Sequence, residues 1–149
     1  MARSPRLAVA VLLAAGFVLV VAAAACVAIG LLNPQLISDQ LPPDAAIDAP
    51  AVGGAAVALG IATGLLGVIH LGTAVALWRR VSIAATVGVV LAAPMAILSF
   101  GLAIAALVSI ASGAAPAIIM LPASVGLAAA VLGYAAATIA IMRARAPVI

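Results

Sequence analysis

The sequence predicts an all-α integral membrane protein whose four transmembrane helices form an antiparallel up-down bundle. Three observations lead to this fold class. Hydrophobic residues make up 69% of the 149 positions and charged residues only 6%, whereas a soluble domain of ordinary composition has about 25% charged residues. Four long apolar runs contain no Asp, Glu, Lys or Arg. All six arginines stand outside these runs at alternate ends, and the three aspartates share a single loop.

The four apolar runs define the expected spans. Each run exceeds the roughly 20 residues that an α-helix needs to cross a hydrocarbon core about 30 Å thick. The runs lack the alternation with a period of two that membrane β-strands show, which argues against a barrel. Nothing in the composition marks a second domain, so residues 1–149 are expected to form one. The spans are expected near residues 7–32, 51–78, 81–112 and 117–142, with a polar outer loop over 33–50.

The arginines predict that both chain ends are cytoplasmic. Lys and Arg near the ends of spans concentrate on the cytoplasmic side of a membrane, and an N-in, C-in topology places every arginine there. The chain has no lysine and is rich in Ala, Gly and Val, which is typical of a high-GC bacterial genome, so we expect the bacterial cytoplasmic membrane. The topology-setting residues are Arg3, Arg6, Arg79, Arg80, Arg143 and Arg145.

The first run has an alternative interpretation as a cleaved signal peptide. Basic residues precede it and small residues stand directly before Cys26, as in the signal peptide of a lipoprotein. However, residues 27–32 stay apolar where a mature lipoprotein should become polar. We therefore favour an uncleaved span. Cys26 is the only cysteine, so no intramolecular disulfide is expected.

A weak internal repeat offers a second view of the architecture. Residues 53–62 resemble residues 126–135, and the same offset places Arg6 on Arg79. A true repeat would make the protein two tandem helical hairpins. Chance matching is a strong competitor in a chain this rich in Ala and Gly, so the repeat stays an alternative.

Small residues are expected to pack the helices together. A helix surface without side chains lets a second helix approach until the backbones touch, and residues 60–64 form the GxxxG motif of such surfaces. We favour packing within the chain, and a homo-oligomer interface is the alternative. The candidate packing residues are Gly53, Gly60, Gly64 and Gly67 on the second run and Gly126 and Gly133 on the fourth.

His70 is the candidate polar-core residue of the runs. A polar side chain in lipid normally contacts a partner or lines a water-filled cavity. Thr63 lies on the same helix face as His70, and Tyr134 is expected at the same depth, because each lies nine residues before an arginine. We predict that the second and fourth spans are neighbours and that His70 and Tyr134 are hydrogen-bonded. A structural role for His70 is favoured over a proton relay, and over a haem or metal ligand, because one histidine supplies one ligand.

The sequence favours a function without catalysis. It contains no GxSxG, HExxH, CxxC or phosphate-binding glycine loop, so we expect no enzyme, no cofactor and no metal. The basic residues are too few and scattered for nucleic acid. The leading hypothesis is an accessory or assembly subunit that binds a membrane-protein partner in the bilayer, or a homo-oligomer. The alternatives are a small transporter or channel component with a polar path around His70, and a binder of a lipid or quinone-like apolar ligand.

Overall fold

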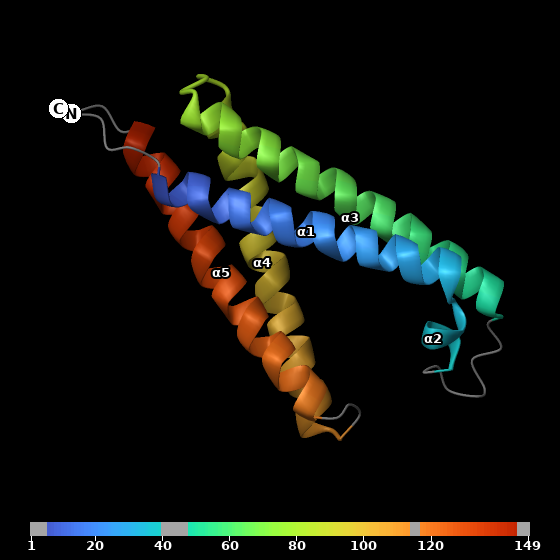
Figure 1. The fold of residues 1–149 in the computed structure, drawn as a ribbon. Coiled ribbons are helices and arrows are strands. Elements are labelled where there is room, and N and C mark those ends of the chain that lie inside the picture. The colour runs from blue at the N-terminus through green and yellow to red at the C-terminus, as the bar shows by residue number, and fades with distance from the viewer. Residues whose placement is uncertain (1–5, 40–47, 114–116, 146–149) are drawn as a thin grey trace. The chain divides into compact units, whose positions relative to one another are not determined.

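The computed structural model (Figure 1) describes residues 6–39, 48–113 and 117–145. These segments are helical and contain no strand, and four of the helices are long and apolar enough to cross a membrane. The predicted all-α class with four candidate spans is therefore confirmed. Arg3 lies outside the described residues. The helices are α1 (Arg6–Leu32), α2 (Gln35–Ser38), α3 (Ala49–Trp78), α4 (Ala84–Ala111) and α5 (Ala117–Arg145).

The start of α3 is fixed by a polar cap ahead of the apolar run. The Asp48 carboxylate accepts a hydrogen bond of 3.0 Å from the backbone N–H of Ala51, which is the N-capping interaction that satisfies an otherwise unpaired donor of the first turn. The helix therefore begins at Ala49, two residues before the span expected from hydropathy. At the other end of the chain, α5 continues past the expected limit of 142 to Arg145, because a helix can extend beyond the apolar stretch.

The turn between α3 and α4 is a Schellman motif with an arginine in its left-handed position. The N–H of Arg80 donates to the Leu77 carbonyl at 3.1 Å, and the N–H of Val81 donates to the Ala76 carbonyl at 3.0 Å, the bond pair that defines this motif. Arg80 has φ of 58°, a conformation that costs a non-glycine residue about 1 kcal/mol. This turn delays α4 to Ala84, three residues after the expected start of the third span.

The described chain divides into two compact units that share α1 and α3. Unit 1 comprises Met1–Leu13 with Gly72–Ile149, and unit 2 comprises Ala14–Leu71. Unit 1 thus contains the first part of α1, the last part of α3, and all of α4 and α5. Unit 2 contains the remainder of α1 and α3 together with α2. The single domain expected over 1–149 stays a prediction.

In unit 2, α1 and α3 are in backbone contact at regular steps of seven residues. A Cβ atom on Gly67 would lie 3.0 Å from the Gly16 carbonyl oxygen, and one on Gly53 would lie 2.7 Å from that of Gly30. Between them, a Cβ on Gly60 would lie 2.9 Å from the Ala23 carbonyl oxygen. Seven residues are close to two helical turns, so each series stays on one face. From one contact to the next, the residue number rises by seven on α3 and falls by seven on α1.

In unit 1, α4 packs along α5 (Figure 1). The buried side of α4 is lined by small residues, which allows close approach of the neighbouring helix. A Cβ on Gly88 would lie 2.9 Å from the Ile141 side chain of α5 and 3.4 Å from that of Leu77 on α3, so these three segments meet at Gly88. The buried residues of α4 are Ala84, Gly88, Ala92, Ser99 and Ala103.

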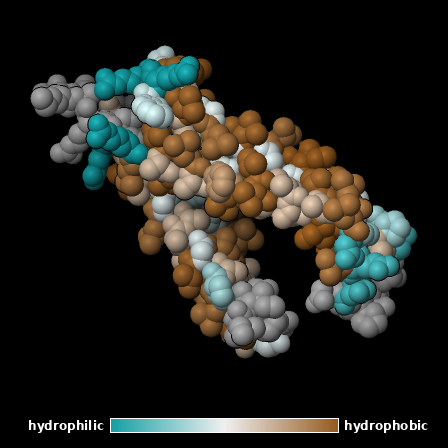
Figure 2. Space-filling model, in the orientation of Figure 1, coloured by the Kyte–Doolittle hydropathy of each residue, from teal (hydrophilic) through white to brown (hydrophobic). Residues whose placement is uncertain are grey.

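The outward surface of the long helices is apolar along most of their length. Figure 2 shows hydrophobic residues over the visible helix faces and hydrophilic residues gathered near the helix ends. Large side chains such as Phe17, Leu65, Ile97 and Leu132 are more than half exposed. Water would strongly disfavour such a surface, whereas lipid accommodates it. The distribution supports a membrane location.

Candidate functional site

His70 is the most buried polar side chain of unit 2. Its exposed fraction is 0%, although it lies among apolar residues of α3. The ring nitrogen Nδ1 lies 2.8 Å from the Leu66 carbonyl oxygen one turn earlier. A carbonyl oxygen can only accept, so Nδ1 carries the hydrogen and donates. In the neutral ring Nε2 is then an acceptor, and its partner must be a donor.

The other two predicted polar-core residues lie in different environments. Thr63 is half-buried on α3, two helical turns before His70 on the same face. Tyr134 belongs to unit 1, where only 4% of it is exposed. Its carbonyl oxygen accepts a hydrogen bond of 2.9 Å from Thr138 Oγ1. Because His70 and Tyr134 fall in different units, the hydrogen bond between their side chains stays a prediction.

A double-mutant cycle tests the His70–Tyr134 pair. We expect His70→Ala and Tyr134→Phe each to lower the free energy of unfolding, and the double variant to lose about 0.5–1.5 kcal/mol less than the two single losses together. The physical reason is that the second substitution removes a group whose partner is already gone. The measurement is unfolding of the purified protein in mixed micelles titrated with SDS. Plain additivity would show that the two side chains do not interact.

Three buried hydroxyl residues complete the polar interior of unit 1. Thr73, Ser99 and Ser124 are each 5–6% exposed, and none of the three was predicted as a polar-core residue. Serine and threonine are tolerated in membrane helices because the hydroxyl can bond to the helix's own backbone, so hydropathy alone gives little signal for them. In the described residues, every buried side-chain nitrogen or oxygen has a hydrogen-bond partner. The polar interior is therefore internally satisfied.

The candidate packing glycines fall into two groups. On α3, Gly53, Gly60 and Gly67 lie against α1, and a Cβ on Gly64 would lie 3.3 Å from the Ala23 side chain. On α5 the contacts are looser. A Cβ on Gly133 would lie 3.6 Å from Val11, which is ordinary van der Waals distance. Gly126 is exposed, and a Cβ there would meet no described atom within 4 Å, so Gly126 does not mediate packing inside unit 1.

Three buried glycines were not predicted as packing residues. Gly16 and Gly30 on α1 face the glycine stripe of α3, and Gly88 on α4 faces Ile141 and Leu77. The signal that could have found the first two was the spacing of seven residues from Gly16 through Ala23 to Gly30, which matches the spacing from Gly53 to Gly67.

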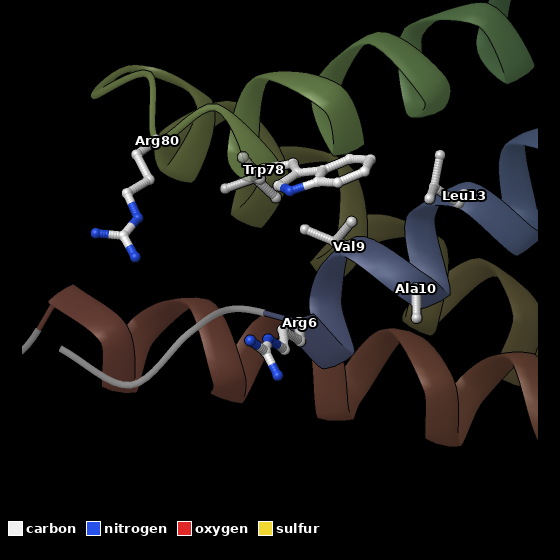
Figure 3. A pocket seen from close by; sticks show the side chains of 7 residues that line it. Arg6, Val9, Ala10, Leu13, Trp78 and Arg80 are labelled. Carbon is white, nitrogen blue, oxygen red and sulfur yellow. The ribbon is translucent and has the colours of Figure 1, made fainter. Parts of the chain in front are cut away.

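An open pocket of about 550 Å³ lies in unit 1, at the end of α3 that carries the arginine pair (Figure 3). Two of its lining residues are cationic, one is the only tryptophan of the chain, and the rest are apolar. Figure 3 shows Arg80 extending from the turn after α3, Arg6 on the opposite side of the opening, and the Trp78 ring close to Val9. The lining residues are Arg6, Val9, Ala10, Leu13, Leu77, Trp78 and Arg80.

The described residues contain no cluster of three or more His, Cys, Asp or Glu side chains that could hold a metal ion. Comparison with known proteins adds no assignment. No protein family model matches the chain, and no curated protein or solved structure matches it either.

Proposed function

We propose that the protein is a non-catalytic membrane subunit that acts by binding another membrane protein, in an accessory or assembly role. One contrast carries this proposal. The buried polar side chains are hydrogen-bonded within the protein, whereas a face of small residues on α5 is exposed. The buried side-chain nitrogen and oxygen atoms of the described chain are all hydrogen-bonded, so the interior offers few free polar groups to a substrate. The outward helix faces are apolar, and Gly126 leaves one of them without a side chain.

The α5 face around Gly126 is suited to a second helix in the bilayer. Ala123 and Ala129 lie one turn away on either side and are exposed like Gly126. Small residues in this arrangement let a partner helix approach closely, which favours association in lipid, where the hydrophobic effect does not drive it. Gly53, Gly60 and Gly67 of α3 are less available, since α1 covers them. Self-association through these three glycines is therefore not favoured.

The topology that we propose is N-in, C-in, in an up-down bundle. Arg6 begins α1, Arg79 and Arg80 follow α3, and Arg143 lies in the last turn of α5. The positive-inside rule assigns these helix ends to the cytoplasm, in a bacterial plasma membrane. A C-terminal fusion to a reporter that is active only in the cytoplasm should give activity. A silent reporter with normal protein levels would contradict this topology.

Purification from the native membrane tests the partner. We expect the tagged full-length protein, extracted in mild detergent, to carry a second protein at fixed stoichiometry in native mass spectrometry. Gly126→Leu should reduce the recovered partner about tenfold, because overpacking an interface costs about 1–3 kcal/mol. Gly101→Leu is the matched control, since a Cβ on Gly101 of α4 also meets no described atom within 4 Å.

The outcomes separate the hypotheses. A partner that is lost with Gly126→Leu and retained with Gly101→Leu supports the proposal. A homo-oligomer without a second protein would replace the accessory role by self-association. A monomer without any partner would refute both and would direct attention to the transporter alternative.

A further inference from the structure

The pocket of Figure 3 combines the groups that recognise an anionic amphiphile. Arg6 and Arg80 supply guanidinium groups, which bind phosphate through two parallel hydrogen bonds. Val9, Leu13 and Leu77 supply an apolar wall. Trp78 is 74% exposed, and tryptophan prefers the level of the lipid headgroups. The volume of about 550 Å³ is within the range of about 300–1,000 Å³ that small-molecule sites occupy.

No aspartate or glutamate side chain lines the pocket beside its two arginines. All three aspartates lie between residues 39 and 48, and Asp48 stands at the opposite end of α3 from Trp78. None of the three aspartates lines the pocket. An anionic headgroup would therefore supply a charge partner that the acidic side chains of the chain do not supply there.

Arg80 has a strained backbone conformation at the edge of the pocket. Arg80 occupies the left-handed position of the turn after α3, with φ of 58°. The turn after α4 has Gly113 in that conformation, with φ of 70°, and glycine is the residue normally found there. The chain thus retains an arginine where glycine would relieve strain. Backbone strain of this kind is concentrated at functional sites.

We propose that this pocket binds the phosphate of an anionic phospholipid. Arg6 and Arg80 bind the phosphate oxygens, the Trp78 ring lies beside the headgroup, and the start of an acyl chain follows Val9 and Leu13. Basic pockets beside membrane helices bind anionic headgroups in this way. The site would tie the α3–α4 turn to the membrane surface and to the beginning of α1.

Tryptophan fluorescence tests the proposal, because Trp78 is the only tryptophan and lines the pocket. The purified full-length protein in nonionic detergent is titrated with phosphatidylglycerol carrying a brominated acyl chain, which quenches a nearby indole. Brominated phosphatidylcholine is the neutral comparison. We expect phosphatidylglycerol to quench at about tenfold lower concentration, which corresponds to about 1.4 kcal/mol, because the anionic headgroup makes charge-assisted hydrogen bonds that the neutral comparison lacks. Equal quenching by the two lipids would overturn the proposal.

Two neighbouring arginines provide a matched control. Arg79→Ala and Arg80→Ala each remove one positive charge from the same turn, and Arg80 lines the pocket whereas Arg79 does not. We expect Arg80→Ala to abolish the preference for phosphatidylglycerol and Arg79→Ala to keep most of it. An equal loss in both variants would reduce the effect to general surface charge and contradict a built site.

Two further measurements separate misfolding and free phosphate from lipid binding. Arg80→Gly relieves the strained turn, so we expect it to melt no lower than the wild type while losing the preference for phosphatidylglycerol. Retained preference in that variant would overturn the role of Arg80. Inorganic phosphate at millimolar concentration should not reverse the quenching if the site needs a lipid. Full reversal would assign the pocket to free phosphate and refute the lipid proposal.

Discussion

Gly53→Ala is expected to destabilise the protein by about 2 kcal/mol, as overpacking at a fully packed position does. The added Cβ would lie 2.7 Å from the Gly30 carbonyl oxygen of α1. This oxygen belongs to a helix backbone and cannot turn aside as a side chain can, so the two helices must separate along their contact. The free energy of unfolding in mixed micelles titrated with SDS measures the loss.

Gly54→Ala is the matched control for this prediction. Gly54 is the next residue of α3, and a Cβ there would meet no described atom within 4 Å. The two variants have the same change in composition and in helix propensity, and differ only in what the new methyl group meets. We expect Gly54→Ala to change the free energy of unfolding by less than about 0.5 kcal/mol. Equal effects of both substitutions would show that α1 and α3 do not meet at Gly53.

His70→Ala is expected to lower the free energy of unfolding by about 2–3 kcal/mol. The His70 side chain is fully buried, so truncation leaves a cavity and removes the hydrogen bond to the Leu66 carbonyl. The same titration with SDS measures the effect. Ile69→Ala is the control, since Ile69 precedes His70 in α3 but is half exposed, and we expect a loss below about 1 kcal/mol.

The His70→Ala variant also distinguishes a structural histidine from one in a transport path. A structural histidine predicts lower stability, with no solute flux in liposomes from either the wild type or the variant. A transport path predicts wild-type flux that the variant alters while its stability is unchanged. The latter result would contradict the structural role and favour the transporter alternative.

The number and approximate positions of the candidate spans could be predicted from the sequence because they depend on local composition. A helix of apolar residues satisfies its own backbone hydrogen bonds in lipid, so each uncharged run has one stable structure whatever its neighbours are. The helix ends were less predictable. Capping by Asp48 and the left-handed turn at Arg80 depend on backbone geometry, which hydropathy does not report.

The packing partners could be predicted only in part. The glycine arc on α3 was visible as a stripe, but its partner series on α1, from Gly16 to Gly30, was not predicted, because its middle member is Ala23 and a spacing of seven is not distinctive in a run this rich in alanine. The internal repeat placed Gly126 in correspondence with Gly53. In the structure Gly53 is in backbone contact and Gly126 is open, since identical local sequence does not determine which helix lies opposite.

The sequence by itself determined the four apolar helices, their charged ends and the presence of small-residue stripes, all of which follow from each segment's preference for lipid or water. Only the tertiary structure decided which stripe is covered, that Arg6 joins Arg80 and Trp78 around one pocket, and that His70 is fully buried. In lipid the transfer of apolar surface is the same for every helix face. The choice among faces therefore depends on close contact between distant segments, and such contact exists only once the chain has folded.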